Sequence, residues 1–295
     1  MATIILEGRE FCVTGGLLRI MALRDELLGD IGDPDTITHL SRQERIPADL
    51  LTFSQHLPDL SPKFSYYMEW DNIAAVPVST YEHWFKEQIH PNTRNKIRKA
   101  QKKGVTVRRE FFTTKLAEGL VDIFNETSVR RGKPYSYFGK DIVTIEKEWS
   151  TDLERSDFLV AYYQNEIIGF IKILYSKEFV RTSGTVAKIS HRDKAPMNAL
   201  LAEAVKICAE KKIPFLVYGH YIYGKKGEDS LSKFKKNNGF QKIDIPKYYI
   251  PMSARGKFGL RLGLHRGIFN CLPSGIHRLL LRFRALWHER LVMKK

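Results

Sequence analysis

The sequence predicts a mixed α/β fold in which a sheet is flanked by helices. The first observation is the order of expected elements from residue 157 to residue 251, which reads strand, strand, strand, helix, strand, helix, strand. The second is the segment after Pro196, where Leu200, Leu201 and Ala204 recur at helical spacing behind a proline that suits a first helical position. The third is composition, because 43% of the 295 residues are hydrophobic, which suffices for sizeable cores.

The N-terminal part of the chain contains fewer regular elements. The alternating, aromatic segment 64–70 predicts a strand, and a hydroxyl at Ser79 or Thr80 can cap a short helix. A basic helix is expected from about Asn92 to Lys103, where the next residue is a glycine. Residues 105–107 are expected to form the strand that follows it.

The elements after residue 110 follow clearer patterns. The apolar stripe between Leu116 and Phe124 marks a helix that is expected to end near Arg131, and two apolar strands over 157–163 and 166–175 meet at a hairpin turn, Gln164-Asn165. The remaining expected elements are a strand over 179–189, the helix from Pro196 to Pro214, a strand over 215–219, a helix over 229–236 and a strand over 241–251.

The net charge of +15 is concentrated in two segments. Residues 255–295 hold ten Lys/Arg against one acid, and residues 91–109 hold eight Lys/Arg and no acid. Local charge of this kind attracts anionic partners, so phosphorylated substrates, RNA and anionic lipid all remain open.

The cysteines and the N-terminus indicate a cytoplasmic protein. Cys12, Cys208 and Cys271 are far apart and lack zinc-type spacing, so free thiols in a reducing compartment are expected. The first ten residues show no secretory signal, and no apolar run approaches the ~18 residues of a membrane span. No metal-ligand cluster is recognised, so no metal site is expected.

Four segments, in this order, carry a family resemblance: the basic segment 93–105, the hairpin 159–169, the helix and strand between Ala195 and Gly219, and Phe234-Lys235 with the following Gly239-Phe240. Together they resemble FemAB-type transferases of the GNAT acyltransferase superfamily. The resemblance implies a GNAT-like mixed sheet flanked by helices, with two GNAT-like halves of which the first is degenerate. The expected domains are then 1–110, 111–252 and a basic amphipathic tail over 253–295.

The resemblance also implies an activity. An N-acyltransferase would move an acyl or aminoacyl group from a thioester or an aminoacyl-tRNA to an amine, which could be a small molecule or a cell-envelope precursor. No bound cofactor is expected, since acyl-coenzyme A or aminoacyl-tRNA would serve as co-substrate. Enzymes that use coenzyme A usually carry a glycine-rich turn before the main helix, whereas residues 191–196 contain no glycine. The choice between the two donors therefore stays open.

Two residues are expected to carry the chemistry. By resemblance, Lys235 matches the family lysine that binds the donor or stabilises its transition state, although it could also be a solvated lysine of a basic run. His220 follows the strand over 215–219 and could accept the amine proton, or could simply be hydrogen-bonded at a strand end. Glu126 could act as a base, but an ion pair with Arg130 explains it more simply.

Binding residues are assigned around this pair. Arg94 and Arg98, on the basic helix, and Tyr218 are expected to contact the acceptor. Donor contacts are expected from Arg192, Ala195, Pro196, Lys225, Lys226 and Phe234.

The C-terminal segment 274–295 predicts a basic amphipathic helix, with Phe283 and Trp287 among its apolar residues. Such a helix suits an anionic membrane surface on the inner, cytoplasmic face, but it could equally dock on the protein's own core. The alternative to an enzyme is therefore a catalytically degenerate protein of the same fold that binds a membrane surface or tRNA.

Overall fold

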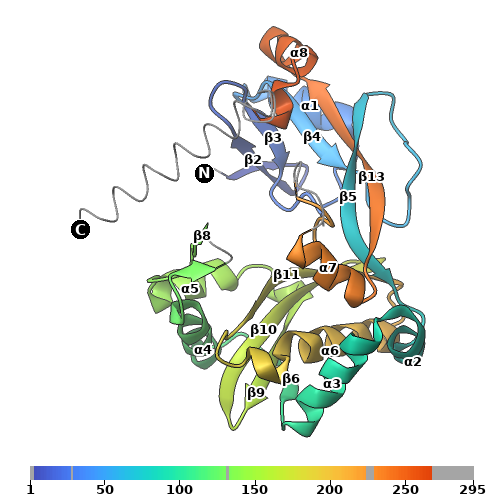
Figure 1. The fold of residues 1–295 in the computed structure, drawn as a ribbon. Helices are drawn as coiled ribbons and strands as arrows, with labels where there is room; N and C mark the ends of the chain where they lie inside the picture. The colour runs from blue at the N-terminus through green and yellow to red at the C-terminus, as the bar shows by residue number, and fades with distance from the viewer. Residues whose placement is uncertain (1–2, 28, 131–132, 224–228, 268–295) are drawn as a thin grey trace, which may run out of the picture. The chain divides into compact units, whose positions relative to one another are not determined.

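The computed structural model describes residues 3–27, 29–130, 133–223 and 229–267 (Figure 1). The chain forms two compact units. Unit 2 comprises Asn72–Asp244, and unit 1 comprises Met1–Asp71 together with the described residues from Ile245 onward. This division differs from the expected domains 1–110, 111–252 and 253–295.

Unit 1 is a small mixed sheet with one crossover helix. Its strands lie in the order β1-β2-β3-β4-β13, antiparallel except for β3 and β4, which α1 connects. The elements are β1 (Thr3–Leu6), β2 (Arg9–Thr14), β3 (Ile20–Leu23), α1 (Pro34–Gln43), β4 (Leu50–Ser54), β13 (Gln241–Pro251), α8 (Ala254–Arg261) and the 3₁₀ turn η4 (Leu264–Arg266).

The core of unit 1 forms between α1 and the sheet. Phe11, Met21, Ile37 and Phe53 are buried there, and Tyr248 of β13 stacks on Phe53 with ring centroids 5.1 Å apart. The sequence did not predict most of these strands, because they are only four to six residues long and the segments between them contain glycine and proline. Each of these strands is buried by its neighbours in the sheet and by α1, so the local sequence pattern does not reveal it.

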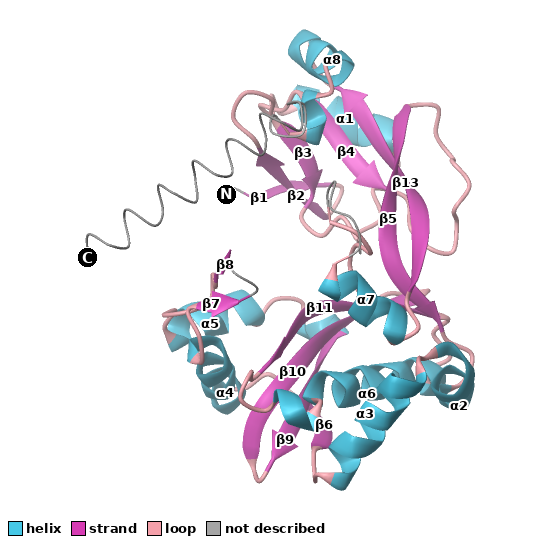
Figure 2. Cartoon of the chain, viewed as in Figure 1, coloured by secondary structure: helices cyan, strands magenta, loops and turns pink. Residues whose placement is uncertain are grey.

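The sheet strands of unit 2 lie in the order β5-β12-β11-β10-β9-β6, with β11 and β12 the parallel pair. Figure 2 labels each of these strands except the short β12. A separate hairpin joins β7 and β8. The elements are β5 (Tyr67–Pro77), α2 (Tyr81–His83), the π-helix η1 (Trp84–Gln88), α3 (Pro91–Lys102), β6 (Thr106–Glu110), α4 (Thr114–Asn125), β7 (Val129–Arg130), β8 (Lys133–Pro134), α5 (Ile142–Trp149), η2 (Leu153–Arg155), β9 (Ser156–Tyr163), β10 (Glu166–Tyr175), β11 (Phe179–Ala187), η3 (Arg192–Lys194), α6 (Pro196–Glu210), β12 (Phe215–Val217) and α7 (Ser230–Asn237).

Helices cover both faces of the unit 2 sheet (Figure 1). Because successive strand residues point to opposite faces, the strands of this sheet divide their side chains between two cores. Leu159 and Ala161 pack in the core that contains α3 and α6, whereas Phe158 and Val160 pack in the core of α4 and α5. A strand buried on both faces reads as a continuous apolar run, as β9 and β10 do.

The same contacts explain why the boundary lies before residue 72 rather than at 110. Ile97 and Ala100 of α3 belong to the core that holds Leu201 of α6. β6 pairs with β9 from Thr106 to Glu110. Residues before 110 thus complete unit 2, and this long-range packing has no local sequence signal.

The hairpin, the basic helix, α6 and α7 form where they were predicted. Thr80 caps the short helix, its side chain accepting from His83 N, and Gln164 and Asn165 both have positive φ, as a two-residue hairpin turn requires. Several bounds differ: the strand expected over 64–70 runs over Tyr67–Pro77, and the helix expected to end near Arg131 ends at Asn125.

Two expectations concern the C-terminal region and membranes. The helix expected over 274–295 lies outside the described residues. No helix within the described ranges is both long and apolar enough to cross a bilayer.

Candidate functional site

The short strand β12 (Phe215–Val217) pairs in parallel with only the first residues of β11. Three residue pairs join them, from Phe179–Phe215 to Arg181–Val217, while β11 continues to Ala187 on its pairing with β10. The chain after β12 stays with β5 instead, because Tyr218 N donates to Ala74 O and Ala74 N to Gly219 O, each at 2.7 Å. We call the resulting divergence, between residues 182–187 and residues 218–219, the strand splay.

The strand splay opens toward the start of α6. β11 ends at Ala187, a turn follows, and α6 begins at Pro196 at the same end of the sheet. Tyr218 spans the divergence, since its hydroxyl lies 2.7 Å from Thr185 Oγ1 of β11. This parting of two central strands is the feature on which the expected transferase site depends.

Lys235 is buried beside the strand splay. Asp229 caps α7 by accepting from Leu231 N and Ser232 N, and this start places Lys235 with 0% exposure. The Lys235 ammonium donates to His220 O and lies 5.0 Å and 4.9 Å from the ring centres of Tyr218 and Tyr223. The reading of Lys235 as a solvated lysine is therefore wrong, because its charge is enclosed by a carbonyl and two aromatic faces.

His220 is held at the end of the same strand. Its Nδ1 lies 2.9 Å from Asn72 O, and Asn72 Oδ1 accepts from Ile222 N at 2.8 Å. Because a carbonyl oxygen can only accept, Nδ1 carries the proton of a neutral ring and the lone pair lies on Nε2. The structural role expected of His220, a hydrogen bond at a strand end, is therefore present.

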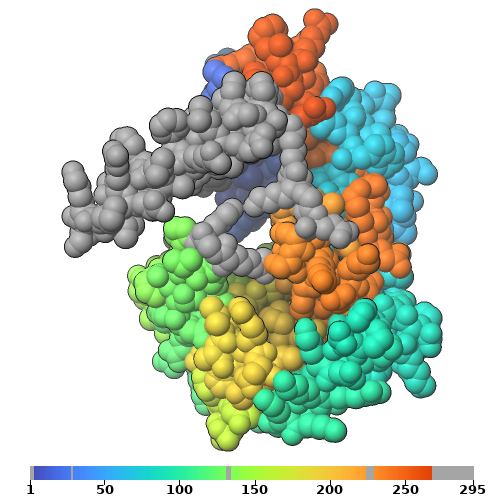
Figure 3. Space-filling view, in the orientation of Figure 1, coloured from blue at the N-terminus to red at the C-terminus, as the bar shows by residue number. Residues whose placement is uncertain are grey.

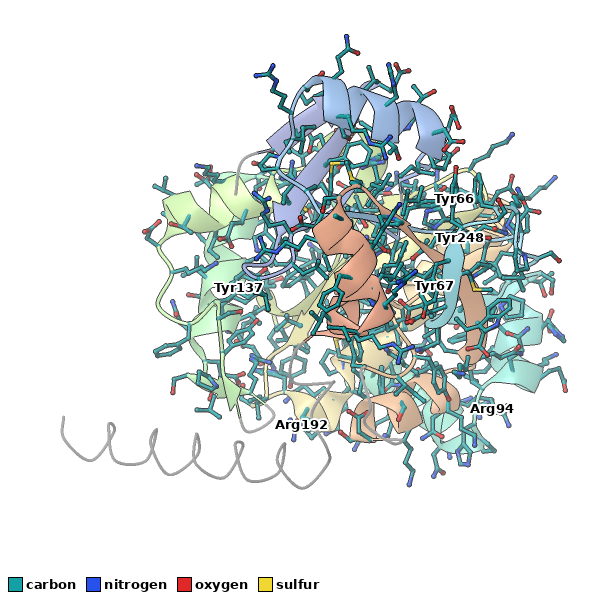
Figure 4. The ribbon with its side chains drawn as sticks, turned by 90° about the horizontal axis from the view of Figure 1, so that it is seen from above. Tyr66, Tyr67, Arg94, Tyr137, Arg192 and Tyr248 are labelled. Atoms are coloured by element: carbon teal, nitrogen blue, oxygen red, sulfur yellow. The ribbon has the colours of Figure 1, made fainter. Side chains whose placement is uncertain are left out.

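The turn before α6 combines cations with a helix start. Ala195 has φ +53° and caps α6 without a side-chain hydrogen bond, and Pro196 is the first helical residue. Arg192 is exposed on this turn (Figure 4). Asp193 pairs with Lys103 of α3 at 2.6 Å and with Lys194 at 3.4 Å.

Glu126 fastens this turn to α4. Its Oε1 accepts from Ser190 N at 2.8 Å and Ser190 Oγ at 2.7 Å, and its Oε2 accepts from Ile189 N at 2.5 Å. Arg130 Nη2 lies 3.4 Å from the same carboxylate, which confirms the ion-pair interpretation. Burial alone would raise the pKa of Glu126, but these hydrogen bonds and the Arg130 charge outweigh it and hold the pKa below its ordinary 4.5. Glu126 is therefore a clamp rather than a poised base.

We expect Glu126→Gln to lower the free energy of unfolding by about 2 kcal/mol at pH 7, because an amide cannot accept all these hydrogen bonds. The contribution of the carboxylate is fully present above the unfolded pKa of about 4.5 and is lost as pH falls through the lower folded value. Urea unfolding of both proteins from pH 7 to pH 3 measures this. A difference that stays constant over the whole range would contradict it.

The expected binding residues have unequal surroundings. Arg94 Nη1 lies within 2.6 to 3.3 Å of three carbonyl oxygens, those of Phe85 and Lys86 in η1 and of Ile89 directly after it, so it supports the chain before α3. Arg98 is exposed, with its guanidinium 5.5 Å from the Phe85 ring centre. Figure 4 labels Arg94 and Arg192, which come from separate elements.

Phe234 is partly buried and its ring lies edge-on to Tyr218, 6.5 Å between centroids. Lys225 and Lys226 lie outside the described residues. Among the described residues no group of three or more His, Cys, Asp or Glu side chains could hold a metal ion.

Sequence reasoning missed a pair of asparagines behind the site. Asn198, in the first turn of α6, donates to Asn238 Oδ1 at 3.1 Å, and Asn238 Nδ2 donates to Phe234 O at 2.7 Å. Asn238 O accepts from Trp84 Nε1 at 3.1 Å. These buried hydrogen bonds join the start of α6 to the end of α7. The one sequence signal for them was the position of Asn198 on the apolar face of the predicted helix, where a polar side chain needs a partner.

This arrangement, with a splayed parallel pair and a helix starting opposite it, is the GNAT-like fold of the FemAB type, in agreement with the expected class. Among solved structures the chain is similar to L-PGS from Bacillus licheniformis, with a TM-score of 0.58 and 15% identity over 90% of this chain and 87% of that one. It is likewise similar to the C-terminal domain of a protein assigned as a lysylphosphatidylglycerol synthetase from Agrobacterium fabrum, with a TM-score of 0.59 and 14% identity over 89% and 86%. FemX has a TM-score of 0.56 and 10% identity over 86% of each chain.

No family model matches the sequence, and no curated protein matches it. At these identities the structural likeness shows the fold.

Proposed function

We propose that the protein is an N-acyltransferase that moves an acyl or aminoacyl group onto an amine. The observation that carries the proposal is the enclosed ammonium of Lys235 beside the strand splay, at the end of the sheet where α6 begins. The fold shared with FemX and L-PGS supports the same class of reaction.

Acyl transfer needs an aligned donor and acceptor, stabilisation of a developing oxyanion, and a sink for the amine proton. The strand splay would take the donor carbonyl near Tyr218, with the positive charge of Lys235 directly behind that ring. The attacking amine forms the new C–N bond, the bond from the acyl carbon to the thioester sulfur or tRNA ester oxygen breaks, and His220 Nε2 accepts the amine proton and returns it to the leaving sulfur or oxygen. Lys235 would act mainly through its electrostatic field, because a charge in a buried site is weakly screened.

We place the donor over the turn before α6, with Arg192, Ala195, Pro196 and Phe234 contributing and Lys225 and Lys226 as further cations. Arg98 and Tyr218 remain the proposed acceptor contacts, while Arg94 would position α3. The acceptor is a small amine or an envelope precursor, reached from the cytoplasmic side.

Isotope transfer tests the proposal. The purified chain is incubated with labelled acetyl-coenzyme A or with labelled aminoacyl-tRNA, each beside a panel of amines. We expect one donor to give labelled amide and His220→Ala to slow its formation. If neither donor labels any amine and neither raises the melting temperature, the transferase assignment fails.

A catalytically degenerate protein of the same fold is the second candidate. It is favoured by the turn over residues 191–196, which lacks the glycines of a coenzyme A cradle. Binding of charged tRNA without any transfer would select this candidate.

A further inference from the structure

Helix α8 lies against unit 1 through its glycines. A Cβ on Gly256 would lie 1.9 Å from Asp49 O, and one on Gly259 would lie 2.7 Å from Leu18 Cδ1. Ser253 Oγ accepts from Gly256 N at 3.0 Å and donates to Asp49 Oδ1 at 2.9 Å. The backbone of α8 at these glycines therefore packs directly on unit 1, and the large side chains of α8 point to solvent.

The chain after α8 is also held firmly. Glu69 Oε1 accepts from His265 Nε2 at 2.8 Å and from Arg266 Nη2 at 2.8 Å. Burial would raise the pKa of Glu69, but the hydrogen bonds from Arg266, His265 and Tyr67 outweigh it and lower the pKa to about 2. These contacts anchor the chain directly after α8 to Glu69 of β5.

That outer face combines apolar and cationic side chains. Phe258 is 64% exposed and Leu262 is 54% exposed. Arg255, Lys257 and Arg261 are exposed beside them, and none forms an ion pair within the described ranges. Figure 3 shows α8, in orange-red, at the surface of unit 1.

The cationic and apolar side chains of this face favour an anionic lipid surface as its partner. No acid occurs between residues 245 and 267, so nothing in that segment neutralises the cations. Exposed aromatic and aliphatic side chains between cations suit the headgroup region of an anionic bilayer, where the apolar groups enter and the charges meet phosphates. A nucleic-acid backbone would pair with the cations but would leave Leu262 in water.

We propose that α8 docks unit 1 on an anionic lipid surface, with Phe258 and Leu262 entering the interface and Arg255, Lys257 and Arg261 contacting the headgroups. This surface is distinct from the segment 274–295 considered from the sequence, and it requires no transfer chemistry.

Vesicle sedimentation of the full chain tests the proposal, using phosphatidylcholine vesicles with and without phosphatidylglycerol. We expect binding only with the anionic lipid, weakened by high salt. The double variant Phe258→Ser/Leu262→Ser should bind about tenfold more weakly. Each charge removed by Arg255→Gln, Lys257→Gln or Arg261→Gln should weaken binding about fivefold.

Phe111→Ser is the matched control, because Phe111 is 88% exposed in unit 2 and should leave binding unchanged. Since all these side chains are exposed, the melting temperatures should agree, which separates lost docking from misfolding. A second readout is Phe258→Trp, whose added emission should be quenched by brominated lipid.

Wild-type binding by the α8 variants would overturn the proposal and assign any lipid contact to the chain beyond residue 267. Binding to single-stranded RNA that the same variants abolish, without vesicle binding, would overturn it in favour of a nucleic-acid surface. Donor assays are unaffected by either outcome, so failure here leaves the proposed transfer reaction standing.

Discussion

Lys235→Met is expected to reduce the rate of acyl transfer by about 10²- to 10³-fold, the usual effect of removing one preorganised charge from a transition state. Methionine retains much of the apolar stem, but the positive charge and its contacts with the Tyr218 and Tyr223 rings are lost. Single-turnover transfer, with whichever donor labels an amine in the isotope-transfer test, measures the change in the chemical step.

A second buried lysine supplies the control. Lys172 Nζ donates to Trp149 O at 3.0 Å and Thr151 O at 2.5 Å, and lies 5.4 Å from the Phe158 ring centre. Burial lowers the pKa of Lys172. Its neighbours belong to the core of α4 and α5, on the sheet face opposite Tyr218.

Lys172→Met should therefore lower stability, as Lys235→Met does, by about 1–3 kcal/mol for the carbonyls left without a partner, yet it should retain transfer. Equal transfer rates in the two variants, whether both fast or both slow, would remove Lys235 from the proposed chemistry.

Gly184→Ala is expected to destabilise unit 2 by about 3 kcal/mol, at the upper end for an overpacked core. An added Cβ would lie 2.3 Å from Trp149 Cη2. The indole cannot move aside easily, because Phe124, Phe158 and Phe170 surround it with centroids 5.0 to 6.5 Å away. At 2–4 °C per kcal/mol for a domain of this size, the melting temperature should fall by roughly 10 °C.

Gly16→Ala is the comparison, since Gly16 has no neighbour within 4 Å of an added Cβ and should change stability by less than about 0.5 kcal/mol. The double variant Gly184→Ala/Trp149→Leu should recover part of the loss, because a smaller side chain makes room for the methyl group. A Gly184→Ala protein that melts with the wild type would show that the ring can shift after all.

The parts of the fold that were predicted correctly have local signatures. The 164–165 turn, the proline at the start of α6 and the apolar runs of β9 and β10 are each readable within about a dozen residues. The unpredicted α5 and the strands of unit 1 are short, and their stability comes from packing against distant elements.

The candidate site was likewise predictable only in part from the sequence. The order of elements along the chain indicated the class of fold, because the positions of strands and helices follow local pattern, whereas Lys235 was singled out only through the family resemblance of the Phe234-Lys235 segment. The burial of Lys235, the capture of residues 189–190 by Glu126 and the use of Arg94 inside the fold were decided only in three dimensions. Each depends on hydrogen bonds to backbone carbonyls or amides, and a sequence does not show which backbone groups a distant side chain will meet.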